Sequence, residues 1–139
     1  MSYKIIGKYI KDLDFKIPNS KSFTLLTKNI SNYKINIDIK SIQLKEKIVE
    51  VETSLSLLPS KNNNENIVTK IIHASIVEID EKIKEKRKIE KIILIDVPND
   101  IYPELRKIFI FIFESSGFKE INISKNVDFQ KLYDLKKIQ

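Results

Sequence analysis

The sequence "LRKIFIFIFESSGF", from Leu105 to Phe118, contains six consecutive apolar residues, three of which are phenylalanine. Such a run suits a buried strand, a piece of a membrane segment, or a helix that is apolar on more than one face. Six residues are far fewer than the about 20 apolar residues that a helix needs to span a bilayer. We therefore exclude the membrane interpretation, and the flanking residues decide between strand and helix.

The flanking residues favour a helix over about residues 100–117. Asn99 or Asp100 can cap its first turn, where Pro103 is also tolerated, and Gly117 supplies a C-terminal stop. Between these signals the apolar residues follow the helical spacing i, i+3, i+4, i+7 and i+8, in the order Leu105, Ile108, Phe109, Ile112 and Phe113. A second, short helix is expected over about residues 128–137, with Asp128 as its cap.

Two residues of the apolar run, Ile110 and Phe111, fall outside this helical stripe. Burying a large apolar side chain is worth about 1.5–3 kcal/mol, so leaving both of them in water is unfavourable. We expect the helix to contact its own sheet on one side and another subunit, through Ile110 and Phe111, on the other.

The residues before Asp80 alternate between apolar and polar types, with the period of two that is typical of half-buried strands. In the first strand one face is predicted to hold Tyr9, Leu13, Phe15 and Ile17, and the other Asp12, Asp14 and Lys16. In the second strand Tyr33, Ile35, Ile37 and Ile39 share a face. A change of phase at Lys40–Ser41 predicts a bulge that returns Ile42 and Leu44 to it.

Two further strands follow. Val49, Val51, Leu55 and Leu57 share one face of the third, the segment from Pro59 to Asn66 has the composition of a hairpin loop, and the fourth strand extends to Asp80. The sequence thus predicts a single α+β domain over residues 1–139. It has a four-stranded antiparallel meander at about residues 3–80, with one long crossing loop from Ser20 to Asn32. A charged connector at 81–98 leads to the long and the short C-terminal helix, packed on one face of the sheet.

The composition limits the possible functions. The net charge of +6 raises the question of nucleic acid, but only two of the 25 basic residues are arginine and there is no tryptophan. We interpret the lysines as general solvating charge and keep a basic nucleic-acid-binding module as an alternative. The charge run at 81–92 is interpreted as a solvated helical or extended connector, with a basic docking surface as the alternative. The absence of a signal-like segment near Met1 predicts a cytoplasmic protein.

Catalysis has little support in the sequence. His73 is the only histidine and lies within an apolar strand pattern, so we expect a core or sheet-face residue rather than a catalytic one. Gly7 and Gly117 are the only glycines, which argues against a glycine-rich phosphate loop. Asp12 and Asp14 could hold a cation, but a solvated strand face explains them better. We predict no enzyme, no catalytic residues, no cofactor and no metal.

Three segments in order resemble the SecB family of protein-export chaperones. They are "GKYIKDLDFKIPN" (Gly7–Asn19), "VPNDIYPELR" (Val97–Arg106) and "SSGFKEINISKNVDFQKLY" (Ser115–Tyr133). The resemblance implies a dimer of dimers with the helices between sheets. It also implies an ATP-independent holdase that keeps non-native preproteins unfolded for Sec-dependent export and delivers them to the translocase ATPase SecA.

The same resemblance implies a client-binding groove. It would be lined by the crossing loop and second strand and by the region around the helix ends: Leu25, Leu26, Ile30, Tyr33, Ile35, Tyr102, Phe118, Ile121 and Ile123.

The resemblance is weaker at the surface with which typical members of the family dock to SecA. Typical members have acidic residues at three positions of the outer sheet face, and here these positions are Asp12, Lys16 and Lys70. The last residues, "DLKKIQ", also differ from the acidic extension of typical members. Holdase activity is therefore better supported than SecA delivery. A SecB-like chaperone dedicated to another client, such as the antitoxin of a toxin–antitoxin operon, is the alternative.

Overall fold

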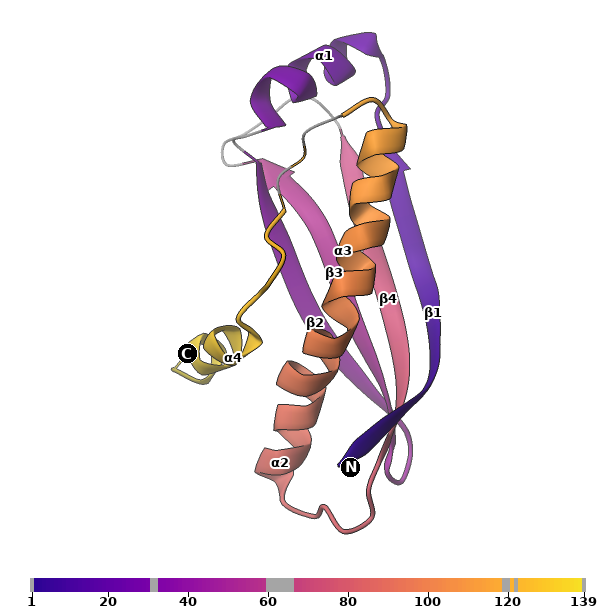
Figure 1. Ribbon diagram of the computed structural model, residues 1–139, viewed down its shortest axis with the longest axis vertical. Helices are drawn as coiled ribbons and strands as arrows, with labels where there is room; N and C mark the ends of the chain where they lie inside the picture. The colour runs from indigo at the N-terminus through magenta and orange to yellow at the C-terminus, as the bar shows by residue number, and fades with distance from the viewer. Residues whose placement is uncertain (1, 31–32, 60–66, 119–120, 122, 139) are drawn as a thin grey trace.

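The computed structural model of the protein describes residues 2–30, 33–59, 67–118, 121 and 123–138. It has an α+β architecture in which one four-stranded antiparallel sheet carries helices across one face (Figure 1). The strands are β1 (Tyr3–Lys16), β2 (Tyr33–Lys45), β3 (Ile48–Pro59) and β4 (Val68–Ile79). The fold class predicted from the sequence is confirmed. The hairpin loop predicted at Pro59–Asn66 lies outside the described residues, apart from Pro59 at the end of β3.

The strand order in the sheet is β1-β4-β3-β2. The last three strands form a meander of neighbouring pairs, whereas β1 pairs with β4, so the chain crosses the sheet between β1 and β2. That crossing was expected as a loop, but most of it is a helix, α1 (Ser20–Asn29). Asn19 begins this helix, because its side-chain oxygen accepts a hydrogen bond from the backbone N–H of Ser22 at 2.8 Å.

One face of the sheet, which we call the inner face, packs against the helices; the other is the outer face. Odd-numbered residues of β3 from Val49 to Leu57 and of β4 from Thr69 to Ile79 point to the inner face and are buried there. They meet a row of buried side chains from the helices. The fully buried apolar residues of this core include Val51, Leu55, Ile71, Val77, Leu105, Phe109 and Phe113. Two contacts join the edge strand β1 to the long helix α3 (Val97–Ser115). The Tyr3 hydroxyl donates to the Asp100 carboxylate, and Lys8 pairs with Glu104 at 3.0 Å.

The β-bulges differ from those expected. The β1–β4 register shifts between Ile10 and Asp12, which moves Tyr9 to the outer face, opposite Ala74. Tyr9 was therefore wrongly grouped with Leu13 on the inner face. The sequence carries a trace of this bulge, because the alternation breaks at the apolar pair Tyr9–Ile10 and the polar pair Lys11–Asp12.

The bulge predicted at Lys40–Ser41 is also wrong. The register between β2 and β3 runs without a shift from Tyr33 to Gln43, and the irregularity comes between Gln43 and Lys45. Ile42, opposite Glu50, consequently points to the outer face and is 44% exposed, and Leu44, at the irregularity, is 48% exposed. Their inner-face neighbours are the polar residues Ser41 and Gln43.

The connector after β4 leads into a single helical rod. It comprises α2 (Lys86–Lys91), a π-helical turn η2 (Ile92–Asp96) and α3 (Val97–Ser115). The cap predicted at Asn99 or Asp100 is wrong, because the helix is already continuous there. The π-helical turn sets the spacing of the buried residues, which is five across the turn and four thereafter: Ile92, Val97, Ile101, Leu105, Phe109 and Phe113.

The end of α3 follows a Schellman motif. The backbone N–H groups of Gly117 and Phe118 donate to the carbonyls of Glu114 and Phe113 at 3.1 and 3.0 Å. Gly117 has a φ of +97°, which a residue with a Cβ adopts only at a cost. The turn directs Phe118 back onto Phe113, with ring centroids 5.7 Å apart. The last helix, α4 (Phe129–Ile138), is capped by Asp128 as predicted, at 3.0 Å from the N–H of Lys131.

Within the described part of the chain, no helix combines the length and the apolar character that crossing a membrane requires.

Candidate functional site

The residues predicted to line a groove divide into two groups. Four are core residues that are at most 4% exposed: Leu26, Tyr102, Phe118 and Ile123. Five are half-buried and retain accessible surface: Leu25, Ile30, Tyr33, Ile35 and Ile121. Only the second group can contact a ligand without rearrangement of the core.

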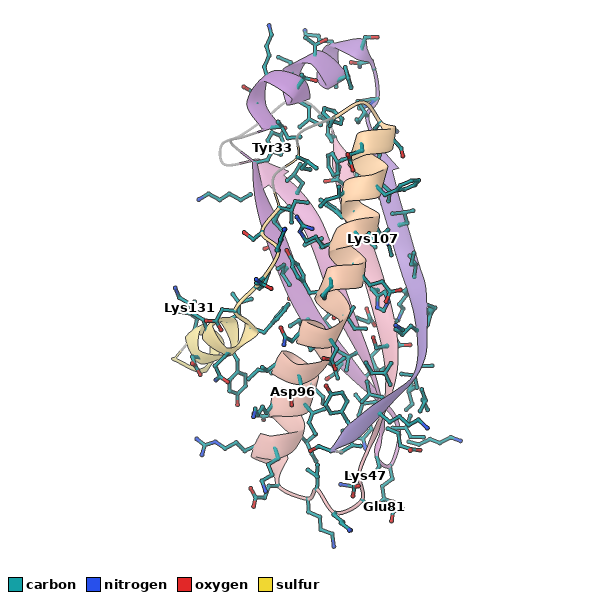
Figure 2. All side chains as sticks on the ribbon, viewed as in Figure 1. Tyr33, Lys47, Glu81, Asp96, Lys107 and Lys131 are labelled. Carbon is teal, nitrogen blue, oxygen red and sulfur yellow. The ribbon has the colours of Figure 1, made fainter. Side chains whose placement is uncertain are left out.

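The half-buried group belongs to the end of the molecule that carries α1 (Figure 1), where Tyr33 begins β2 (Figure 2). Aromatic packing holds this end together, since the Phe23 and Phe118 rings are 5.0 Å apart. The segment after α3 is fixed by two hydrogen bonds to carbonyl groups. The Tyr102 hydroxyl donates to Ser124 at 2.6 Å, and the Arg106 Nε–H donates to Ile123 at 3.0 Å. Burial raises the pKa of Tyr102, so its hydroxyl remains a donor at neutral pH.

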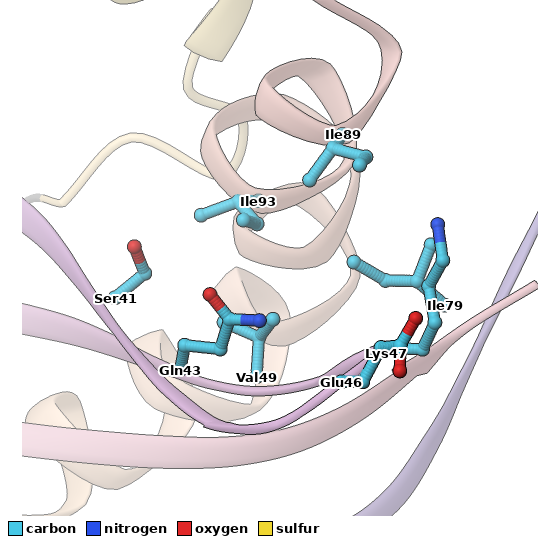
Figure 3. A pocket seen from close by; sticks show the side chains of 8 residues that line it. All are labelled: Ser41, Gln43, Glu46, Lys47, Val49, Ile79, Ile89 and Ile93. Carbon is cyan, nitrogen blue, oxygen red and sulfur yellow. The ribbon is translucent and has the colours of Figure 1, made fainter. Parts of the chain in front are cut away.

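The opposite end of β2 borders a pocket that the sequence analysis did not anticipate (Figure 3). Its volume is about 230 Å³. The floor is formed by Val49 and Ile79, and Ile89 and Ile93 of the helical rod stand above it. Polar side chains complete the lining: Ser41, Gln43, Glu46 and Lys47.

The pocket exists because the inner-facing isoleucines of β2 stop at Ile39. A serine at position 41 leaves space between the sheet edge and the rod that an isoleucine there would fill. The signal is present in the sequence, as the change from apolar to polar residues at odd positions. It was interpreted as a bulge, which would have placed Ile42 and Leu44 in this space.

Two hydrogen bonds of Lys47 hold the turn between β2 and β3 in place beside the pocket. Lys47 has a φ of 67°, in the left-handed region that a lysine seldom adopts. Its side-chain ammonium donates to the backbone oxygen of Ile83, and its own carbonyl accepts from the N–H of Ile79 at 2.8 Å. These two bonds join the turn to the end of β4 and to the connector that leads to α2.

The three residues predicted for partner docking share the outer face near the end of β1. Asp12 lies opposite Ile72 and Lys16 opposite Val68, both on β4. Lys70 is directly opposite Asp14, so this pair sets a negative charge against a positive one. With Lys70 so close, Asp12 and Asp14 do not form an isolated acidic pair of the kind that would hold a cation.

A charged cluster lies on the same face and was not predicted. Glu50 of β3 is 6% exposed although it faces away from the helices. It accepts a hydrogen bond from the Tyr9 hydroxyl and pairs with Lys11 at 3.1 Å, and Lys11 also pairs with Glu52 at 2.8 Å. These hydrogen bonds, that from Tyr9 first, lower the pKa of Glu50. Glu50 resembles any other polar residue of an alternating strand, so nothing in the sequence distinguishes it.

The outer surface of α3 carries the two residues predicted for an interface. Phe111 is 68% exposed and Ile110 is half-buried. Both border a shallow hollow of about 430 Å³, whose other lining residues are Pro103, Arg106, Lys107 and Glu114. Lys107 is seen on this surface in Figure 2.

His73 lies in the core, 2% exposed, directly opposite Thr53 of β3. Burial lowers the pKa of His73, which therefore remains neutral at physiological pH. Among the described residues, the side-chain atoms Thr53 Oγ1, His73 Nδ1 and Ser75 Oγ have no hydrogen-bond partner. The same part of the chain has no group of three or more His, Asp or Glu residues that could hold a metal ion.

Comparison with known proteins places this geometry in a family. The sequence pattern of the family described as preprotein translocase subunit SecB matches residues 1–139. A relative in Pelagibacter ubique (strain HTCC1062), named "Putative protein-export protein SecB", is 42% identical over 132 residues, covering 95% of this chain and 94% of its own. Protein-export protein SecB of Anaplasma marginale (strain Florida) is 28% identical over 141 residues, covering 94% of this chain and 79% of its own.

A solved structure has the same fold. It is a SecB-like chaperone of Mycobacterium tuberculosis in complex with a peptide from an antitoxin, with a TM-score of 0.65 and 10% sequence identity. The similarity covers 91% of this chain and 88% of that one. A structural likeness at this identity concerns the fold alone. The match of the family pattern to residues 1–139, together with the relative at 42% identity, shows that this chain belongs to the SecB family.

Proposed function

We propose that this chain is an ATP-independent chaperone of protein export, which binds non-native preproteins and keeps them unfolded. The single observation that carries this proposal is its membership of the SecB family, matched over residues 1–139. Relatives that cover most of this chain are named protein-export protein SecB. The proposal includes no catalytic step, and we infer that the protein acts in the cytoplasm.

The surface supports this function physically. Non-native clients expose apolar side chains and unpaired backbone groups. The half-buried residues at the α1 end, Leu25, Ile30, Tyr33, Ile35 and Ile121, offer apolar contact. Beside them runs β2, the strand at one edge of the described sheet, whose backbone can pair with an extended segment. Neither kind of contact requires a particular client sequence.

The proposed holdase activity is tested by light scattering from a chemically unfolded client that aggregates on dilution. We expect an excess of the protein to suppress the aggregation equally with and without ATP. The double substitution Leu25→Ser with Ile30→Ser should weaken the suppression, because both side chains are half-buried in the proposed groove. Leu26 is unsuitable for this test, since it is 0% exposed and its loss would destabilise the core.

The matched control is Ile42→Ser with Leu44→Ser, which removes two exposed apolar side chains from the outer face. It should suppress aggregation as well as the wild type does. A client that aggregates equally fast with and without an excess of wild-type protein would contradict the proposed function.

We also propose that the protein assembles as a dimer of dimers through the outer surface of α3. Phe111, with 68% of its surface exposed, is the most exposed large apolar side chain among the described residues. A second copy that covers it would remove this surface from water.

A chaperone dedicated to an antitoxin is the second candidate. The observation in its favour is the fold shared with the mycobacterial SecB-like chaperone, whose structure contains a peptide from an antitoxin. At 10% identity that likeness carries less weight than the relatives named for protein export. An operon that encodes a toxin and an antitoxin next to this chain would favour the second candidate.

A further inference from the structure

We propose that the pocket of Figure 3 binds one apolar side chain of an extended client segment, and that acidic residues flank this side chain in the preferred clients. The inference rests on the proposed function, because the client is the non-native polypeptide of that proposal. It adds a second point of contact with the client, at the end of β2 opposite the half-buried group around Tyr33. It also adds a preference for clients with negative charge at this point.

The size and the lining of the pocket determine what it can hold. Its volume of about 230 Å³ is below the range of about 300–1,000 Å³ that is usual for small-molecule and cofactor sites. Val49 and Ile79 form an apolar floor that is at most 7% exposed, and half-buried Ile89 and Ile93 stand above it. A single aliphatic or aromatic side chain fits this space, with the polar rim left for the backbone on either side of it.

The strand beside the pocket can present such a side chain in the correct register. β2 is at one edge of the described sheet, and an added strand places every second side chain on the inner face. Ile35 and Ser41 are both inner-face residues of β2, six positions apart. At about 3.3 Å per residue this separation is about 20 Å. A client segment of about seven residues therefore reaches from the first contact group to the pocket.

The charges around the pocket indicate which segments are preferred. The connector and α2, over residues 81–91, contain six basic and three acidic residues, a net charge of +3. The adjoining turn at residues 45–47 adds +1, so these two segments together hold +4, which Asp80 at the start of the connector reduces to +3. The six basic side chains of residues 81–91 are all exposed, as are Glu81 and Glu85, whereas Glu90 is half-buried and bonded to Tyr133. An acidic segment is attracted to such a surface, and a basic one is repelled.

The inference is tested with three fluorescent nine-residue peptides of alternating apolar and polar residues, whose binding is followed by anisotropy at low and high salt. The first has a central leucine between acidic residues, the second has the same leucine between lysines, and in the third glycine replaces the leucine of the first. We expect the acidic peptide to bind most tightly, and its advantage over the basic one to decrease with salt. The glycine peptide should bind roughly tenfold or more weakly than the first.

Substitutions locate the site. Ser41→Phe, at an exposed position that lines the pocket, should fill it and weaken binding of the acidic peptide by roughly tenfold or more. Its matched control is Ser56→Phe on the outer face, which should leave binding unchanged. Lys86→Glu with Lys88→Glu should reduce the preference for the acidic peptide by roughly two- to fivefold for each charge. The control with the same change in net charge is Lys16→Glu with Lys70→Glu.

The outcomes separate this inference from the proposed function. If the wild type suppresses aggregation but binds the acidic and basic peptides equally, or if Ser41→Phe binds as the wild type does, the inference is wrong and the holdase proposal stands. If no peptide binds and aggregation is not suppressed, the proposed function itself fails. Displacement of the acidic peptide by a single-stranded oligonucleotide would also overturn the inference, by assigning the basic surface to nucleic acid.

Discussion

Glu50 shows how one residue can be buried on an open sheet face. Its carboxylate accepts from the Tyr9 hydroxyl and pairs with Lys11, and its side chain is covered although no helix lies on that side. Tyr9 reaches Glu50 only because a bulge between Ile10 and Asp12 places it on the outer face. The hydrogen bond between Tyr9 and Glu50 therefore depends on the bulge.

We predict that this carboxylate makes stability sensitive to acid. The folded-state pKa of Glu50 is below its usual value of 4.5, so its contribution is present above that pH and is lost as the pH falls through the folded-state pKa. Glu50→Gln should be less stable than the wild type at pH 7, and the difference should shrink at about pH 3.5. Urea unfolding at both pH values measures this.

The control for this experiment is Glu78→Gln, an exposed glutamate on the same face of β4. It should leave the unfolding midpoint almost unchanged at either pH. Equal acid sensitivity of the wild type and Glu50→Gln would show that the cluster contributes nothing to the pH dependence.

Among the helices, α3 depends on its last turn. Gly117 adopts a φ of +97°, and a Cβ at this position would come within 3.3 Å of the Phe23 ring. Gly117→Ala should therefore destabilise the protein by roughly 1–2 kcal/mol, whereas Gly117→Asn should cost less because asparagine tolerates the left-handed region. Thermal or urea unfolding measures both. Ser115→Ala, exposed on the same helix, should change little, and an equal effect of all three substitutions would argue against a specific role for the turn.

The elements that sequence reasoning found are those with a long periodic signal. The strands and α3 repeat their apolar residues over ten or more positions, so periods of two and of about four are clear. Helix α1 has only ten residues, so its signal is short: after the cap at Asn19, Phe23, Leu26 and Ile30 follow the helical spacing i, i+3 and i+7. The positions of Tyr9 and Ile42 were mistaken because bulges and register depend on the neighbouring strand, which a single segment does not specify.

In the candidate site, too, the sequence indicated which residues take part but not how the fold arranges them. The family resemblance supplied the groove residues, but their burial depends on which residues the helices cover, and Tyr102 and Ile123 belong to the core. The pocket beside Ser41 is lined by residues from separate parts of the chain: β2, β3 with the turn before it, β4 and the helical rod. No local pattern contains that information.

For the whole molecule, the exposed side of α3 predicts assembly. We expect a homotetramer in equilibrium with dimers, and Phe111→Asp should shift it to dimers or monomers because an unpaired charge is unfavourable in an apolar interface. Light scattering of purified protein measures the mass. Leu135→Asp, which changes an exposed apolar residue of α4 instead, is the control and should leave the mass unchanged. A wild type that is monomeric at micromolar concentration would contradict the prediction.

The charges on the outer face determine how strongly the molecule binds a cationic partner. Asp12, Lys16 and Lys70 share that face and together give +1, which repels a lysine-rich tail. We expect weak or absent binding to such a tail of a SecA-type ATPase. Lys16→Glu with Lys70→Glu should improve binding, most clearly at low salt, where charges interact beyond the about 8–10 Å of physiological screening. Calorimetric titration of both proteins measures this, and tight wild-type binding that the double substitution leaves unchanged would place docking elsewhere.

The π-helical turn at Ile92–Asp96 has a consequence for how this protein can evolve in length. Buried residues recur every four positions from Val97 onward, but five positions separate Ile92 from Val97. The turn thus accommodates one additional residue without rotating the helix that follows it. A chain with one residue fewer between these two positions would form an ordinary helical turn and keep the same residues against the sheet. We therefore expect deletion of a single residue to be tolerated here, in the middle of a long helix, where it would elsewhere disrupt the core.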